Sequence, residues 1–108
     1  MSQPIDTLLV YMTAPSEAVA LSLARSAVEA GLAACGNIIP GLRSVYRWKG
    51  EICDDPEVLV LFKTTRPRFE ALRSHLVDAH PYDCPEVVAT PVVAGHPDYL
   101  AWVAENVD

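Results

Sequence analysis

The chain has 108 residues, of which 51% are apolar, 8 are Lys or Arg and 14 are Asp or Glu, so its net charge is −6. This length and composition are typical of one globular domain, and we expect residues 1–108 to form a single domain. The acidic balance lacks the positive charge that binds phosphate backbones, so we expect no nucleic acid partner.

The first half of the chain predicts a strand, a helix and one arm of a hairpin. Residues 7–13 are a short β-branched and aromatic run, which indicates a strand buried on both faces. From Ser16 to Gly31 small apolar residues recur at steps of three and four, with Ser16 placed to cap a helix and Gly31 to end it. Residues 32–48 predict a long strand with a bulge or bend at residues 40–41, Pro-Gly.

The second half predicts the return strand, a second helix, a fourth strand and a last helix. Residues 51–62 predict a strand that returns from the hairpin turn, and we expect the segment 54–56, Asp-Asp-Pro, to interrupt this strand. Thr65 is placed to cap the second helix. Residues 86–90 predict the fourth strand, and Pro97 opens a short C-terminal helix.

This order, β-α-β-β-α-β with an added C-terminal helix, predicts a ferredoxin-like α+β fold with a long bent hairpin. In that fold the helices cover one face of an antiparallel sheet. Because the strands carry apolar residues at both alternations, the other face would be exposed in a lone copy. A cyclic arrangement such as a trimer would cover that face without leaving an open end.

The cysteines and the N-terminus indicate the compartment. Cys35, Cys53 and Cys84 are an odd number without C-x-x-C spacing, so free thiols in a reducing compartment are the simplest interpretation. Residues 1–6 carry no secretion signal, and no apolar run approaches the about 20 residues that span a bilayer. We expect a cytoplasmic protein with no membrane partner.

The densest group of functional side chains spans residues 80–86, HPYDCPE, between a helix and a strand. In one interpretation His80 closes the helix and the prolines fix a rigid crossover. In the other, thioether and thiolate ligands that favour Cu(I) form a soft metal site. Its ligands would come from Met12, Cys35, His80, Cys84 and Glu86. A Cys84 nucleophile would also need an orienting group and an oxyanion hole, and no signature of these surrounds it.

An aromatic and basic group lies toward the hairpin end. Alternation places Tyr46 and Trp48 on one face, and Arg43 and Arg47 on the other. Two interpretations stay open for the aromatic pair: an anchor in a protein interface, or a platform for a nucleotide or small anion.

Six segments in order along nearly the whole chain match those of a known family: LLVYMTAP at 8–15, GLAACGNIIPG at 31–41, SVYRWKG at 44–50, KTT at 63–65, HPYDCPE at 80–86 and DYLAW at 98–102. Through them the chain resembles the CutA divalent-cation tolerance family. The resemblance implies a ferredoxin-like protomer in a homotrimer of PII-like architecture. It also implies a role linked to copper and other divalent metals, and no enzymatic reaction or organic cofactor.

The resemblance further implies a ligand cleft at the subunit interface. Its side chains would be Cys35, Tyr46, Trp48, Lys63, His80, Tyr82 and Glu86, with Cys84 beside them. Copper ligands are implied at His80 and Met12, but copper-binding members carry Cys where Met12 stands and a second His where Ala79 stands. This departure favours weak Cu(I) binding over strong Cu(II) binding.

We therefore expect a non-enzymatic, cytoplasmic homotrimer that binds copper, another divalent cation or a small ligand in clefts between subunits and contributes to metal tolerance. The alternative is a PII-like signalling or interaction protein whose hairpin tips engage a partner and whose metal binding is incidental. An acylphosphatase-like enzyme of the same fold would need a glycine-rich, basic loop after the first strand, and residues 13–16, TAPS, supply neither feature.

Overall fold

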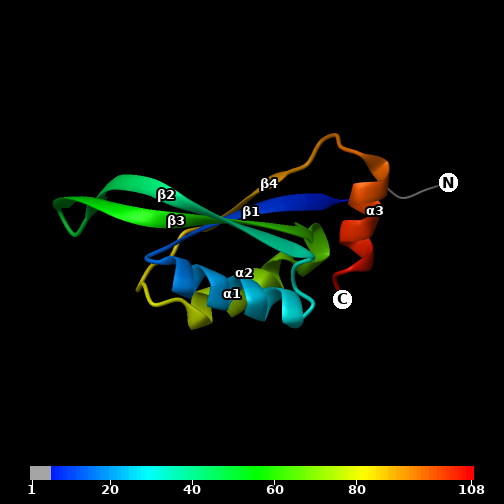
Figure 1. The fold of residues 1–108 in the computed structure, drawn as a ribbon, viewed down its shortest axis with the longest axis horizontal. Coiled ribbons are helices and arrows are strands. Elements are labelled where there is room, and N and C mark those ends of the chain that lie inside the picture. The colour runs from blue at the N-terminus through cyan, green and yellow to red at the C-terminus, as the bar shows by residue number, and fades with distance from the viewer. Residues whose placement is uncertain (1–5) are drawn as a thin grey trace.

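The computed structural model of the protein describes residues 6–108. Over this range the chain forms four strands, three α-helices and one short 3-10 helix (Figure 1). In chain order they are β1 (Thr7–Ala14), α1 (Glu17–Glu29), β2 (Cys35–Trp48), β3 (Glu51–Thr65), the 3-10 helix η1 (Arg66–Arg68), α2 (Phe69–Ala79), β4 (Val87–Pro91) and α3 (Pro97–Glu105).

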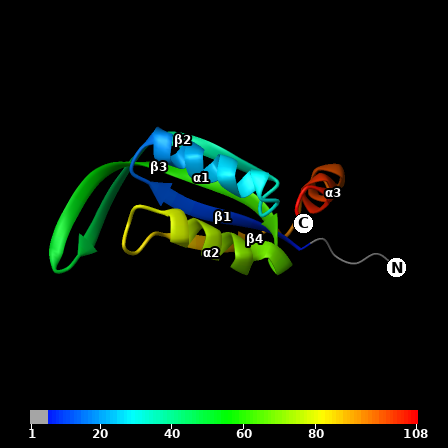
Figure 2. The same ribbon diagram turned by 90° about the horizontal axis from the view of Figure 1, so that it is seen from below.

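The strands form one antiparallel sheet in the order β2-β3-β1-β4. Helices α1 and α2 lie side by side across one face of the sheet, and α3 lies at the end farthest from the hairpin tip (Figure 2). This is the split β-α-β arrangement, so the predicted ferredoxin-like α+β fold with an added C-terminal helix is confirmed. No helix within residues 6–108 has the length and apolar character needed to span a membrane.

The core lies between the sheet and the two helices. Alternate β1 residues, among them Val10 and Met12, point to the helices and are fully buried. The face of α1 that meets them is mostly alanine, which lets the helix pack close to the sheet. A Cβ at Gly36 would lie only 3.2 Å from the ring of Phe62, so a larger residue there would require this ring to shift by a few tenths of an ångström.

Helix α1 begins and ends where its sequence predicts. The Ser16 hydroxyl accepts a hydrogen bond from the N–H of Val19 at 3.2 Å. At the other end, the N–H of Leu32 donates to the carbonyl of Ala27, and Gly31 takes a left-handed conformation with φ of 74°. This is the Schellman motif, which glycine adopts without strain.

The hairpin is less interrupted than predicted. Strand β3 runs unbroken from Glu51 to Thr65, so the predicted break at residues 54–56 is wrong. Among the described strands, β2 is the only neighbour of β3 before Val58, and such an edge setting tolerates Pro56. The predicted bend at residues 40–41 is confirmed, since the β2-β3 register shifts between Ile39 and Leu42.

Three other predicted boundaries are corrected. The strand predicted over residues 32–48 begins at Cys35, because the preceding residues turn the chain out of α1. Thr65 is the last residue of β3, paired with Thr7, and its side chain makes no capping hydrogen bond. The predicted second helix begins as the 3-10 helix η1, and α2 starts only at Phe69. The fourth strand, predicted over residues 86–90, is Val87–Pro91.

The face of the sheet opposite α1 and α2 is apolar and only partly covered; we call it the open sheet face. Its apolar side chains are Leu9, Tyr11, Ile39, Leu59, Leu61 and Val88. Ile39 and Val88 are 42% and 52% exposed. Apolar residues thus occupy both alternations, as predicted, and an apolar patch of this kind marks an interaction surface.

The core assignment can be tested with a matched pair of leucines. Leu72 is fully buried, whereas Leu21 on the adjacent helix is 51% exposed. We expect Leu72→Ala to lower the free energy of unfolding by about 2–5 kcal/mol, because it leaves a cavity. Leu21→Ala should change it by about 0.5 kcal/mol or less. Urea denaturation followed by circular dichroism measures both, and equal losses would contradict the packing described here.

Candidate functional site

The predicted cleft residues fall into two separate groups in one chain. We call the first the hairpin group: Tyr46 and Trp48 from β2, and Tyr82, Cys84 and Glu86 from the loop between α2 and β4. We call the second the sheet-end group: Cys35 and Lys63, which face each other across β2 and β3.

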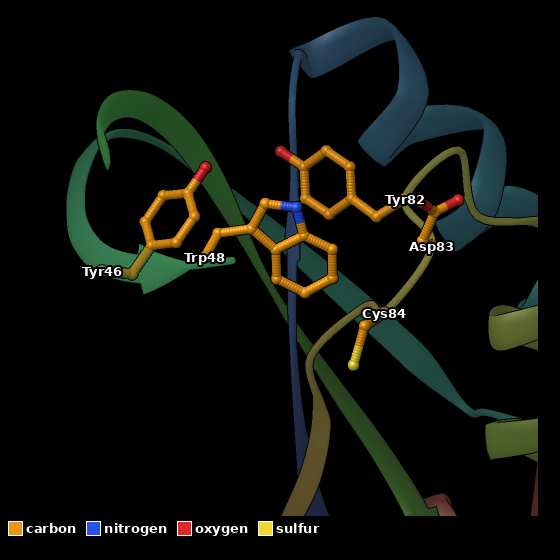
Figure 3. A pocket seen from close by; sticks show the side chains of 5 residues that line it. All are labelled: Tyr46, Trp48, Tyr82, Asp83 and Cys84. Atoms are coloured by element: carbon orange, nitrogen blue, oxygen red, sulfur yellow. The ribbon is translucent and has the colours of Figure 1, made fainter. Parts of the chain in front are cut away.

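Three aromatic rings of the hairpin group surround a small cavity (Figure 3). The cavity has a volume of about 180 Å³ and is lined by Tyr46, Trp48, Tyr82, Asp83 and Cys84. Glu86 lies in an adjoining, wider groove of about 510 Å³. Tyr46 and Trp48 share a face of β2, as their alternation predicts, so both side chains reach the cavity.

Each tyrosine of the cavity is held by a carboxylate on β3. The Tyr46 hydroxyl donates to Asp55 at 2.8 Å, and the Tyr82 hydroxyl donates to Glu57 at 2.7 Å. The first bond lies within the hairpin, and the second ties the loop after α2 to it. The hydrogen bond that Tyr46 donates to Asp55 raises the pKa of Tyr46 to about 12. The pKa of Tyr82 is raised as well, mainly by burial of its hydroxyl and secondly by its hydrogen bond to Glu57. Both phenols are therefore neutral at physiological pH.

The hairpin carries two cations near this site, Lys49 in its turn and Arg43 in β2. Lys49 and Gly50 both have positive φ, 51° and 82°, as a two-residue type I′ turn requires. This turn carries the Lys49 ammonium over the indole of Trp48, with Nζ 5.7 Å from the ring centroid. Arg43 donates two hydrogen bonds to Asp54, at 2.7 and 3.1 Å, so its charge is already paired.

Both ring nitrogens of His80 are in use. The Nε2 atom donates to the carbonyl of Thr13 at 2.8 Å, and Nδ1 accepts from the N–H of Tyr82 at 3.1 Å. His80 is buried, and it follows Ala79, the last residue of α2. It links the end of α2 to the end of β1. The ring does not meet the last carbonyls of α2, as one interpretation of residues 80–86 expected, and bonds β1 and the following loop instead.

The predicted metal pair of His80 and Met12 stays a prediction. Met12 is fully buried in the core between the sheet and the helices, whereas Cys35 lies on the open sheet face. Between residues 6 and 108 no three side chains of His, Cys, Asp and Glu gather closely enough to hold a metal ion. A metal at His80 would have to replace one of its two hydrogen bonds.

The sheet-end group places a cation beside a thiol. The Lys63 ammonium donates to the Sγ of Cys35 at 3.7 Å and also to the side chain of Asn37. Tyr99 of α3 lies close to Cys35. The pKa of its phenol is raised, mainly by burial and secondly by this cysteine. The group therefore combines one positive charge, a half-buried sulfur and an aromatic ring at the end of the sheet that carries α3.

Sequence reasoning missed the carboxylates of the hairpin group. Asp55 was not among the predicted site residues, because the segment 54–56, Asp-Asp-Pro, suggested a break in the strand. Glu57 follows that segment, and Asp83 lies within the predicted group 80–86 but was not named as a site residue. A register that places Ser44 opposite Asp55 would have revealed the diagonal contact with Tyr46. Asn37 and Tyr99 were missed too, although Asn37 lies two residues after Cys35 and so shares its face.

The two groups lie far apart along the sheet. Cys35 and Trp48 are the first and last residues of β2, and a strand of this length extends over about 40 Å. The molecule is 53 Å long, and Figure 1 shows the hairpin tip and α3 at its opposite ends. One chain therefore cannot bring the seven predicted cleft residues into a single cleft.

Comparisons with known proteins agree with this fold. Residues 8–106 match the family described as CutA1 divalent ion tolerance protein. The chain is 49% identical over 98 residues to the divalent-cation tolerance protein CutA of Thermus thermophilus, covering 91% of this chain and 95% of that protein. A solved structure of the Thermus thermophilus protein superposes with a TM-score of 0.91 at 47% identity, over 94% of this chain and 99% of that one.

The likeness extends to eukaryotes. Crystalline CutA1 from Oryza sativa superposes with a TM-score of 0.94 at 38% identity, over 99% of this chain and 98% of that one. The chain spans smaller shares of two full-length relatives: 64% of the CutA homolog of Xenopus laevis and 58% of the chloroplastic CutA of Arabidopsis thaliana. The shared part is thus the fold described above.

The contact between Tyr46 and Asp55 predicts a pH dependence. Because the folded pKa of Tyr46 is about 12, above the ordinary value of 10.0, its contribution to stability is present below pH 10 and is lost as pH rises toward about 12. We expect Asp55→Asn to lower the pH at which this phenolate forms, as measured by ultraviolet absorbance. Asp54→Asn is the control, since Asp54 bonds Arg43, and an equal shift in both variants would contradict the assignment.

Proposed function

Since this chain belongs to the CutA1 divalent ion tolerance family, we propose that it binds divalent metal ions, copper among them, or a small ligand in clefts between copies of itself. It would contribute to metal tolerance in this way, without catalysing a reaction. The proposal is carried by one observation: the predicted cleft residues lie in two groups at opposite ends of the molecule.

A second copy supplies the simplest way to join the two groups. If the hairpin group of one chain meets the sheet-end group of the next, the contact is head to tail. A head-to-tail contact either closes into a ring or continues as a filament, and a ring of three is the closed form that we propose. The open sheet face supports this assembly, since its apolar side chains would be covered in the ring.

The joined cleft would combine complementary charges. The hairpin group brings the carboxylates of Asp83 and Glu86, and the sheet-end group brings the ammonium of Lys63. Cys35 and Cys84 would add soft sulfur atoms, which suit Cu(I). At His80 and Met12, the other proposed ligands, burial and existing hydrogen bonds favour weak binding.

We place the protein in the cytoplasm. Cys35, Cys53 and Cys84 are free thiols, which a reducing compartment maintains. The names of relatives include a chloroplastic protein and a periplasmic one, so the family spans several compartments.

The second candidate function is that of a PII-like interaction protein. It is favoured by the exposure of Val45 and Ile52, 68% and 63%, on the part of the hairpin that extends beyond β1. In this case the hairpin would engage another protein, and metal binding would be incidental.

The assembly can be tested through the lysines, of which the chain has only two, Lys49 and Lys63. Carbodiimide joins an ammonium directly to a carboxylate that it touches. In a mixture of light and heavy isotope-labelled protein, we expect Lys63 to couple to Asp83 or Glu86 with mixed-isotope peptides in the mass spectrum, because the two ends come from different copies. Sedimentation should give three times the chain mass of 11.7 kDa.

Lys63→Arg is the control for this coupling, since it keeps the charge and does not react. A sedimenting mass of 11.7 kDa, or Lys63 couplings only within one chain, would overturn the joined cleft.

Metal binding is tested by calorimetric titration with Cu(I) and Cu(II). We expect saturable Cu(I) binding that weakens in His80→Gln and Met12→Leu, two substitutions that remove a ligand atom while nearly keeping the side-chain volume. Val10→Leu, another change in the buried part of β1, is the control for effects of core repacking. Absence of stoichiometric binding would reject the metal form of the proposal and favour the interaction protein.

A further inference from the structure

The cavity of the hairpin group has the composition of an aromatic cage. Three rings, Tyr46, Trp48 and Tyr82, account for most of its lining, together with Asp83 and Cys84 (Figure 3). Two of the rings come from β2 and the third from the loop after α2, so the cavity depends on the fold of the whole chain. Ring faces carry negative charge density and attract cations that have left water.

The charges around the rings favour a cation over an anion. Asp55 and Glu57 accept hydrogen bonds from the two phenol hydroxyls and so place negative charge beside Tyr46 and Tyr82. Asp83 lines the cavity itself, and Glu86 lines the adjoining groove. Against these carboxylates stand Arg43, which is paired with Asp54, Lys49 above the indole and, in the joined cleft, the Lys63 ammonium of the next copy.

Lys49 shows that the indole already accepts an ammonium. Its Nζ lies 5.7 Å from the ring centroid of Trp48. This distance is below the limit of about 6 Å for attraction between a cation and a ring face. The lysine is held there by the tight turn at the hairpin tip. A second cation in the cavity would share this ring and would be repelled by Lys49.

The size and donor set of the cavity indicate an organic cation. At about 180 Å³ it is smaller than the roughly 300 Å³ of drug-sized pockets, so it would take a small head group. Within the described residues, 6–108, no three ligands gather for a bare metal ion. A methylated ammonium has no N–H to satisfy, so ring faces and one carboxylate suffice to bind it.

We propose that the hairpin group binds the methylated ammonium head group of a small organic cation between Tyr46, Trp48 and Tyr82, with Asp83 as its counter-ion. The proposal gives the chemical class of the small ligand. It rests on the proposed function in one respect, the placement of the ligand site in the hairpin group. The cavity exists within one chain, so binding does not depend on the joined cleft.

The probe is choline, a trimethylammonium alcohol, and its neutral isostere is 3,3-dimethylbutan-1-ol, in which carbon replaces nitrogen. We expect choline to bind saturably to the purified full chain, with upfield shifts of its methyl protons in NMR from the ring currents. The affinity of the neutral alcohol should be lower by a factor of at least about ten, because it has the same shape without the charge.

The chain offers a matched pair of tryptophans for the variants. Trp48 is 41% exposed in the cavity, and Trp102 is 42% exposed on α3. Trp48→Leu should weaken choline binding about tenfold, and Trp102→Leu should leave it unchanged. Asp83→Asn, at an exposed residue whose replacement leaves the core intact, should also weaken binding, and Lys49→Met should strengthen it.

Three results would overturn the proposal: no saturable choline binding, equal binding of the neutral alcohol, or equal losses in the two tryptophan variants. None of them bears on the mixed-isotope coupling of Lys63 or on copper titration. Failure of the cation site and failure of the joined cleft are therefore separable.

Discussion

The pairing of β2 with β3 is the constraint on which the rest of the structure depends. These strands are longer than β1, which pairs with β3 only from Val58 to Thr65, so the hairpin extends beyond the four-stranded sheet. Within residues 6–108, no further strand pairs with either outer edge of that extension. The extension carries Tyr46 and Trp48 toward the loop after α2, and it leaves Cys35 and Lys63 at the other end of the sheet.

Carboxylates hold this extension in place and also give it its chemical character. Asp54 pairs with Arg43, Asp55 accepts from Tyr46, and Glu57 accepts from Tyr82 in the loop. The first bond lies within an exposed ion pair and stabilises the hairpin little. The other two bonds orient the rings of Tyr46 and Tyr82 at the cavity and place a carboxylate beside each ring. Through them the hairpin forms part of the candidate site.

His80 connects the helix layer to the sheet in a similar way. Its ring bonds the end of β1 through Thr13 and the following loop through Tyr82, so it sets where that loop leaves α2. The position of Tyr82 in the cavity follows from these bonds. A residue predicted as a metal ligand thus has a structural part in the site, because a buried imidazole requires partners for both nitrogens.

The sequence by itself determined the order of elements, the ends of α1, the bend near Pro40 and the apolar character of both sheet faces, since these follow from local periodicity and turn chemistry. It also determined the family through motifs spread along the chain. Only the tertiary structure decided that residues 54–56 continue a strand, because cross-strand contacts outweigh the local preference for a turn. It alone placed Asp55 and Glu57 beside the tyrosines and divided the cleft residues between two ends of the sheet. Spacing along a chain does not give the register between strands, and that register determines which distant side chains meet.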